Sequence, residues 1–155
     1  MTTILVADDC ANIRQLLSQE FAEEGYRVLV ARDGKEAVEV VRLDRPDVAI
    51  LDIWMPRVNG LEAAAHIANL DAAIPIILFT NNDELCIGDT RSAYATACLE
   101  KGHDLTELKR TVVSVLARRN GEPQPRLGLP PIPGRSPGTP GMHGSRASLT
   151  ASHNR

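Results

Sequence analysis

The chain has 155 residues, with 17 Lys and Arg against 20 Asp and Glu and only five aromatic residues. This length suits one folded domain with some chain left over, and it excludes a large multidomain enzyme. No apolar run approaches the roughly 18 residues of a membrane span, and Met1 to Ala7 is too short for a signal peptide, so we expect a cytoplasmic protein with no membrane association. With a net charge of −3 and no basic groove with interleaved aromatics, we expect no direct DNA binding.

The cysteines indicate the redox setting. Cys10, Cys86 and Cys98 form neither a CxxC pair nor an even-numbered framework. This pattern predicts neither a disulfide nor a thiolate zinc site, and a reducing compartment fits it best. Cys10 adjoins Asp9, and acidic neighbours disfavour a reactive thiolate, so we expect Cys10 to be a small packing residue.

Charge and composition divide the chain near residue 120. Residues 1–120 contain 13 Lys and Arg and 19 Asp and Glu, whereas residues 121–155 contain four Arg and one Glu. The second stretch also holds seven of the ten prolines and six of the eleven glycines, and it has neither helical nor strand periodicity. We therefore predict one folded domain over residues 1–120, followed by a disordered, basic, Pro/Gly-rich tail over residues 121–155.

Short apolar runs rich in Val and Ile alternate with amphipathic stretches in the first 120 residues. Most runs are apolar throughout, as parallel strands covered on both faces must be. The pattern predicts an α/β domain with a doubly wound, flavodoxin-like, five-stranded parallel sheet of order 2-1-3-4-5 and helices on both faces. The five expected strands span residues 3–7, 27–31, 48–51, 74–79 and 95–99.

The stretches that follow these runs predict five helices, four of which have one clear apolar face. Gly25 stands where the C-terminal cap of the first helix belongs, and Asp104 and Glu107 have capping-box spacing ahead of the last. The fourth stretch, residues 83–91, has the weakest pattern. The apolar faces comprise Ile13, Leu16, Leu17 and Phe21; Ala37, Val38 and Val41; Leu61, Ala64, Ile67 and Ala68; and Leu105, Leu108, Val112, Val115 and Leu116.

Polar residues follow the predicted strands. Asp8 and Asp9 follow the first strand, Asp52 the third, Thr80 the fourth and Lys101 the fifth. The carboxyl ends of parallel strands share one edge of a sheet, and the first and third strands are neighbours in this order, so the three carboxylates should converge.

Converging carboxylates require a cation or a retained proton, because one such pair at about 4 Å costs on the order of 4 kcal/mol at an effective dielectric near 20. Oxygen ligands at a partly open site favour Mg²⁺, which accepts a phosphate oxygen as a further ligand. Lys101 can neutralise another phosphoryl oxygen, and the Thr80 hydroxyl can donate to one. The set predicts an aspartyl-phosphate site with Asp52 as the nucleophile.

Each acidic residue also has a structural interpretation. Asp8 and Asp9 could cap a helix, and Asp52 could form a turn before Pro56 and Gly60. Suitable groups at four strand ends of one sheet nevertheless favour the functional interpretation.

The same residues resemble the receiver domain of bacterial two-component response regulators, from Thr3 to about Arg119. The resemblance lies in the opening strand with its acidic pair (4–9), in the Asp-Ile-Trp-Met-Pro loop with Gly60 (52–60), in residues 31–37, and in the order and spacing of Thr80 and Lys101. It implies that Asp52 takes a phosphoryl group from a histidine kinase or phosphotransfer protein. It also implies that Asp9, Asp52 and the Trp54 carbonyl hold Mg²⁺ with help from Asp8, that Thr80 shifts toward the phosphoryl group, and that Lys101 pairs with it.

Three positions depart from the family pattern. Cys98 stands where the family usually has a Tyr or Phe, Gly102 replaces the proline that commonly follows the lysine, and Asn81 replaces a small residue. These differences leave the phosphate lifetime and the mode of switching open.

The resulting hypothesis is a stand-alone response regulator, because nothing after Arg119 resembles an output domain. We expect signalling to a downstream protein through the fourth helix, fifth strand and fifth helix, and no enzymatic activity beyond phosphoryl transfer to, and hydrolysis at, its own Asp52. A receiver-like scaffold that works without phosphate is the alternative. A phosphohydrolase is a weaker one, since Trp54 stands where such an enzyme needs an acid. The kinase, the target, the role of the tail and the oligomeric state are not predicted by the sequence.

Overall fold

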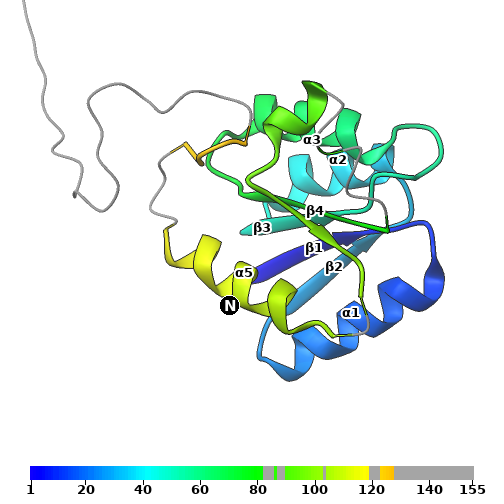
Figure 1. The fold of residues 1–155 in the computed structure, drawn as a ribbon, viewed down its shortest axis with the longest axis vertical. Helices are drawn as coiled ribbons and strands as arrows, with labels where there is room; N and C mark the ends of the chain where they lie inside the picture. Colours follow the sequence, from blue (N-terminus) through cyan, green and yellow to red (C-terminus); the bar gives the residue numbers. More distant parts are fainter. Residues whose placement is uncertain (82–85, 87–89, 103, 119–122, 128–155) are drawn as a thin grey trace, which may run out of the picture.

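The computed structural model describes residues 1–81, 86, 90–102, 104–118 and 123–127. Within them the chain forms a five-stranded parallel sheet of order β2-β1-β3-β4-β5 with helices packed on both faces (Figure 1). The predicted fold class and strand order are confirmed. The strands are β1 (Thr3–Ala7), β2 (Arg27–Ala31), β3 (Val48–Leu51), β4 (Ile76–Thr80) and β5 (Ala97–Glu100).

The first three strands have the predicted bounds, whereas β4 and β5 each begin two residues later than predicted. Pro75 has no N–H to contribute to a strand ladder, and β4 begins directly after it. The β5 start follows, because Thr96 N donates to Ile76 O at 2.7 Å and Ala97 is the first residue paired with β4. The described helices are α1 (Ala11–Glu23), α2 (Gly34–Asp44), α3 (Gly60–Leu70), the 3-10 helix η1 (Thr90–Tyr94) and α5 (Thr106–Ala117).

Two apolar layers cover the sheet. Helices α2 and α3 pack on one face and α1 and α5 on the other, as the ribbon shows (Figure 1). In β1, Leu5 and Ala7 belong to the first layer and Ile4 and Val6 to the second, so successive side chains alternate between two buried faces. This double burial fixes the strand register, because a slip of one residue would exchange the two faces.

Helix ends and faces follow the sequence with two corrections. Gly25 has φ +94° after α1 and its N–H donates to Ala22 O, which confirms the predicted cap. Leu16, expected on the buried face of α1, is 44% exposed. Leu105, rather than Asp104, is the N-cap of α5, and the Asp104 carboxylate accepts from Thr106 N, two residues farther along. Most of the predicted fourth helix lies outside the described residues.

The prediction that the cysteines form no disulfide is wrong. Cys86 and Cys98 are disulfide-bonded, with Cα atoms 6.6 Å apart, whereas Cys10 is free and exposed rather than a packing residue. The sequence pattern failed here because pairing depends on how the chain brings two distant positions together, which cysteine spacing alone does not reveal.

Residues 123–127, which the sequence places in the tail, are hydrogen-bonded to the domain. Gln124 N donates to Ala72 O, and Leu127 N donates to Ala95 O. The Arg126 guanidinium donates to Ala72 O, Ile74 O and Thr96 Oγ1 at 3.1 to 3.2 Å. Residues 123–127 therefore contact the backbone just before β4 and just before β5. The rest of the predicted tail, from residue 128 onward, lies outside the described residues.

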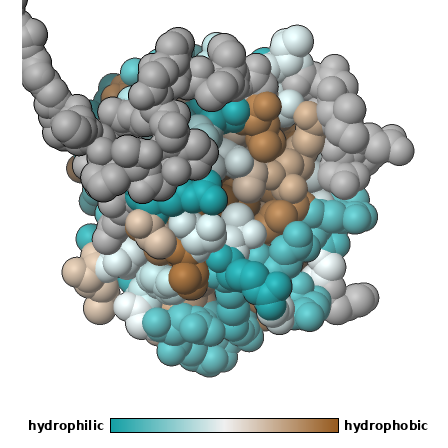
Figure 2. Space-filling model, turned by 60° about the vertical axis from the view of Figure 1, so that its left-hand side comes forward, coloured by the Kyte–Doolittle hydropathy of each residue, from teal (hydrophilic) through white to brown (hydrophobic). Residues whose placement is uncertain are grey.

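Apolar side chains are not confined to the core. Figure 2 shows brown, apolar patches between hydrophilic areas on one face of the molecule. In the sheet of the described residues, strand β5 lies at the edge and pairs with β4, and its residues Ala97, Cys98 and Leu99 are only half-buried. Val113 on α5 is 58% exposed. The β5 edge and α5 therefore offer apolar groups to solvent.

Candidate functional site

Three carboxylates meet at the carboxyl edge of the sheet. Asp8 and Asp9 directly follow β1, and Asp52 directly follows β3, which is the neighbour of β1. The ladder continues into these residues, since Asp52 N donates to Ala7 O at 2.9 Å and Asp8 N donates to Ala31 O at 3.1 Å. Oxygens of the three side chains lie within 4.8 Å of one another, with Asp8 and Asp52 buried and Asp9 exposed. The predicted convergence of these carboxylates is thus present in the structure.

The structural interpretation of the acidic pair is not supported. The N-cap of α1 is Cys10, which makes no side-chain cap bond, and neither Asp8 nor Asp9 occupies that position. The Asp8 carboxylate accepts from Cys10 N at 2.9 Å, which orders the turn after β1. One Asp8 oxygen thus holds the turn while the other accepts from Lys101 Nζ.

Lys101 supplies the positive charge at this edge. Its Nζ lies 2.6 Å from Asp8 Oδ2 and 3.4 Å from Asp52 Oδ2, and its side chain is only 11% exposed. Its backbone N–H donates to Thr80 O at 2.7 Å, so the chain after β5 is tied to the end of β4. Two buried carboxylates therefore share one ammonium group.

The electrostatics of this cluster are unbalanced. Burial raises the pKa of Asp52 above its ordinary value, the nearby charge of Asp8 raises it further, and Lys101 opposes both effects without cancelling them. For Lys101, burial lowers the pKa, but the hydrogen bond that its ammonium donates to Asp8 and the charges of Asp52 and Asp8 outweigh burial and raise it. Negative charge at the site exceeds what Lys101 neutralises, which favours the binding of a further cation.

Thr80 and Trp54 complete the set that the sequence singled out. Thr80 is the last residue of β4, is fully buried, and pairs with Glu100 in the register of β4 with β5. Trp54 lies two residues after Asp52, and its side chain is 62% exposed. The strands thus bring Thr80 and Lys101 to the edge that carries Asp8 and Asp52, and Trp54 belongs to the loop that follows Asp52.

The loop after Asp52 is held by close backbone packing. A Cβ on Gly60 would lie 2.0 Å from the Asp52 carbonyl oxygen, so only glycine allows α3 to begin this close to the loop. Gly60 N donates to Ile53 O at 2.9 Å, and Asn59 caps α3 by accepting from Glu62 N. The loop from Asp52 to Gly60 is therefore held at its start by the hydrogen bond of Asp52 N to β1 and at its end by the cap of α3.

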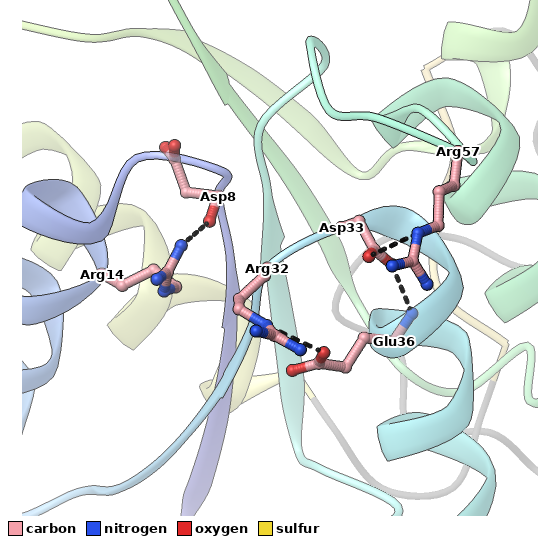
Figure 3. A network of polar contacts seen from close by, with 6 residues as sticks. All are labelled: Asp8, Arg14, Arg32, Asp33, Glu36 and Arg57. Carbon is pink, nitrogen blue, oxygen red and sulfur yellow. Dashed lines mark hydrogen bonds and ion pairs between the residues drawn. The ribbon is translucent and has the colours of Figure 1, made fainter.

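Sequence reasoning did not find a second support for this loop, shown in Figure 3. Asp33 is buried, caps α2 by accepting from Glu36 N at 2.8 Å, and lies 3.6 Å from Arg57 Nε. Arg57 belongs to the loop after Asp52 and has a left-handed backbone angle, φ 68°. Because Asp33 is the N-cap of α2, its ion pair with Arg57 links α2 to this loop. Asp33 and Glu36 have the spacing of an N-terminal cap, a signal in the sequence that could have identified the first half of this contact.

Arg14 is a further neighbour of the site. Its guanidinium donates to the backbone oxygen of Asp8 at 2.8 Å from the first turns of α1 (Figure 3). Because this bond goes to the main chain, the two Asp8 carboxylate oxygens still accept from Cys10 N and from Lys101 Nζ. No motif in the sequence indicates this contact.

The donor set fits a magnesium ion. Three carboxylates from two neighbouring strand ends supply hard oxygen ligands, and exposed Asp9 leaves one side open to solvent. Burial, and after it the charge of Asp8, raises the pKa of Asp52, so a bound cation would stabilise its ionised form. Histidine and cysteine ligands, which would favour zinc or copper, are absent from this described cluster.

Comparison with known proteins identifies the class. The family model of the response regulator receiver domain matches residues 4–113, and the chain belongs to this family. It is therefore a response regulator receiver domain of two-component signalling, as the sequence resemblance predicted.

Particular relatives agree with this assignment. The chain is 35% identical over 116 residues to the transcriptional regulatory protein PdtaR of Mycobacterium tuberculosis, covering 74% of this chain and 57% of PdtaR. It is 38% identical over 82 residues to the response regulator MprA of Mycolicibacterium vanbaalenii, covering 53% and 36%. The matches thus span between about a third and somewhat more than half of these relatives.

Solved structures share the fold. The response regulator TrrA of Thermotoga maritima, solved in complex with Mg²⁺-BeF, is 38% identical with a TM-score of 0.71 over 74% of this chain and 99% of TrrA. In a second structure, solved as a complex with the histidine kinase ThkA, the matched chain gives a TM-score of 0.69 at 38% identity, over 75% of this chain and 99% of the matched chain.

Among the described helices of the present chain, none is long and apolar enough to cross a membrane.

Proposed function

We propose that Asp52 accepts a phosphoryl group from a phosphohistidine, with Mg²⁺ bound by Asp8, Asp9 and Asp52, and that the phosphorylated domain signals by protein contact. The observation that carries this proposal is the buried pair of Asp8 and Asp52, which share Lys101 and lie within 4.8 Å of Asp9. The binding of Mg²⁺ and a phosphoryl group would add the positive charge and the oxygen ligands that this arrangement lacks.

In the proposed transfer, a carboxylate oxygen of Asp52 attacks phosphorus. The P–N bond to the donor imidazole breaks as the P–O bond to Asp52 forms, and the bonding pair remains on the imidazole nitrogen. Bound Mg²⁺ would supply charge neutralisation at the phosphoryl oxygens, with Asp8, Asp9, Asp52 and the Trp54 carbonyl as ligands. Lys101 would exchange its contact with Asp52 for one with a phosphoryl oxygen, and the Thr80 hydroxyl would donate to another.

The kinase and the target follow from the same proposal. The complex of TrrA with ThkA supports a histidine kinase, or a phosphotransfer protein, as the phosphoryl donor for this chain. We propose that a downstream protein binds the surface of the fourth helix, β5 and α5, where β5 is an edge strand and Val113 is exposed. In this proposal the domain acts in the cytoplasm, with no direct DNA binding and no substrate other than its own phosphoaspartate.

Intact-mass measurement tests the nucleophile. With Mg²⁺ and acetyl phosphate or phosphoramidate, the full chain should acquire one phosphoryl adduct that is stable in acid and labile in base. Asp52→Asn should acquire none, whereas Asp44→Asn, an exposed carboxylate at the end of α2, should label as the wild type does. A wild type that stays unlabelled with these donors and with its kinase would favour a scaffold that works without phosphate.

Trp54 allows a separate test of the metal. It is the only tryptophan in the chain, and its loop follows Asp52, so its emission should change as Mg²⁺ binds. Millimolar Mg²⁺ should also raise the melting temperature, since a ligand of the native state stabilises it. Asp9→Ala should remove both responses and Asp44→Asn neither. Unchanged emission and melting temperature of the wild type would exclude the site.

A further inference from the structure

We propose that Cys86 and Cys98 form a reversible dithiol–disulfide pair that sets how far the β4–β5 edge responds when Asp52 is phosphorylated. The inference rests on the proposed phosphoacceptor function and adds to it a second, redox input. The bond joins position 86, six residues after Thr80, to β5, three residues before Lys101.

The place of the bond connects it to the site. Cys98 is paired with Leu78 in the register of β4 with β5, two residues before Thr80 in β4. The backbone N–H of Lys101 donates to Thr80 O, which joins the same two strands at their carboxyl ends. Thr80 and Lys101 are the two groups proposed to move toward a phosphoryl group. The disulfide therefore joins a residue shortly after Thr80 to a residue shortly before Lys101.

The link restricts movement. A disulfide requires Cα atoms within about 7 Å, and those of Cys86 and Cys98 are 6.6 Å apart. If Thr80 shifts toward a phosphoryl group, Cys86 can separate from Cys98 on β5 only by the small distance that the bond permits. Reduction removes this limit, so the reduced protein should reach a larger phosphorylation-dependent change.

Noncovalent contacts hold the same region without the bond. The Ser92 hydroxyl donates to Cys86 O at 2.6 Å, and Cys86, Tyr94 and Cys98 pack against the layer formed by α2 and α3. These contacts would keep the two thiols close after reduction, which makes the bond able to re-form. Both cysteines are half-buried rather than fully buried, so a small reagent can reach the pair.

The chemistry is exchange with a low-molecular-weight disulfide. One protein thiolate attacks a sulfur of this oxidant and expels one thiolate, forming a mixed disulfide. The second protein thiolate then attacks the protein sulfur of that bond and expels the other thiolate. Two protein thiols thereby lose two electrons to the oxidant, and their two protons pass to the two released thiolates. Excess small thiol or dithiol reverses the reaction by the same steps.

Thiol counting tests whether the pair is reversible. The full chain carrying Cys10→Ser, which removes the free third cysteine, is equilibrated in buffers from oxidised to reduced dithiothreitol, alkylated under native conditions and weighed. We expect no alkylation at the oxidised end, two adducts at the reduced end, and return to none on reoxidation. Two adducts throughout would exclude the bond, and none throughout would make it a permanent structural link; either result overturns the proposal.

Amide NMR tests the coupling. Spectra of the Cys10→Ser protein are recorded with and without beryllium fluoride and Mg²⁺, in oxidised and in reduced form. Shift changes at residues 97–102 should be about twofold smaller in the oxidised form, because the bond disfavours the shifted conformation. Cys86→Ser and Cys98→Ser should respond like the reduced protein in both buffers. Equal responses of the two redox forms would overturn the coupling.

The two proposals fail in different ways. If Asp52 acquires no phosphoryl adduct and neither redox form responds to beryllium fluoride, the proposed function fails and the coupling fails with it, whatever the thiol count shows. If Asp52 is phosphorylated and both redox forms respond equally, the phosphoacceptor function stands and only the redox input is rejected.

Discussion

At the carboxyl edge of the sheet, Lys101 faces two buried carboxylates, whereas at the amino edge Arg126 donates to two backbone carbonyls and the hydroxyl of Thr96. Burial and Asp8 raise the pKa of Asp52 at the first edge, and burial lowers the pKa of Arg126 at the second. Both edges contain a partly buried cation, but only the first also contains two buried carboxylates.

The difference separates a binding site from a structural contact. Arg126 donates to oxygens that belong to the fold itself, and among the described residues these acceptors are two backbone carbonyls and one hydroxyl, with no carboxylate. Lys101 leaves two carboxylates sharing one positive charge, an arrangement that a metal and a phosphoryl group can complete. Removal of each cation should therefore destabilise the fold, and only one of the two losses should be repaired by Mg²⁺.

The largest effect is expected from Lys101→Met. It leaves Asp8 and Asp52 buried without a counter-charge, so without Mg²⁺ the free energy of unfolding at neutral pH should fall by about 3 kcal/mol. Millimolar Mg²⁺ should restore part of this loss by replacing the missing charge. Urea unfolding with and without Mg²⁺ measures both, and an equal loss in the two conditions would contradict the proposed metal site.

The same variant has a pH signature. The pKa of Lys101 in the folded protein lies above its ordinary value of 10.5, so its contribution to stability is complete below pH 10.5 and is lost as pH rises through the folded value. The wild type should lose more stability than Lys101→Met in that alkaline range. Parallel alkaline unfolding curves for the two proteins would argue against this ion cluster.

Arg126→Met should produce the next largest effect. Three hydrogen bonds from one guanidinium are lost at the amino edge, and we expect the free energy of unfolding to fall by about 2 kcal/mol. Mg²⁺ should not change this loss, in contrast to Lys101→Met. Urea unfolding is again the measurement, and a variant as stable as the wild type would show that residues 123–127 do not support the domain.

Asp52→Asn should stabilise the metal-free protein, by about 1 kcal/mol at neutral pH, because it removes a buried charge next to Asp8. The raised pKa of Asp52 means that the wild type gains stability below the ordinary value of 3.8 and loses it as pH rises through the folded value. Asp52→Asn should not show this loss. Thermal unfolding between pH 3 and pH 8 compares the proteins, and a destabilised Asp52→Asn would indicate that its bond with Lys101 outweighs the repulsion.

Asp104→Ala provides the smallest effect, at an exposed charge before α5. Hydrogen bonds from the Thr106 hydroxyl and N–H lower the pKa of Asp104, so its contribution exists above pH 3.8 and is lost as pH falls through the lower folded value. The variant should be slightly less stable at neutral pH and should converge with the wild type in acid. A deficit that grows in acid would contradict this assignment.

Much of the molecule follows from local pattern. Three strands have the bounds that their apolar runs predict, and the alternation of strands with helices predicts a doubly wound parallel sheet, whose common order 2-1-3-4-5 is the one observed. The sequence also predicted which polar residues lie at the strand ends, because all parallel strands with helical crossovers end at one edge of the sheet. These residues are Asp8, Asp9, Asp52, Thr80 and Lys101. A side chain that follows a strand is therefore placed by its position in the sequence.

Tertiary packing decided the rest. The Cys86–Cys98 bond, the ion pair of Asp33 with Arg57 and the contacts of Arg126 join residues between 12 and 54 positions apart. The sequence shows the members of these contacts but not their distance, because helix docking and loop paths set the distance. The sequence by itself therefore determined the sheet and the residues at its carboxyl edge. Only the folded structure determined which cation is shared by carboxylates, which is bound to backbone oxygens, and which two cysteines meet.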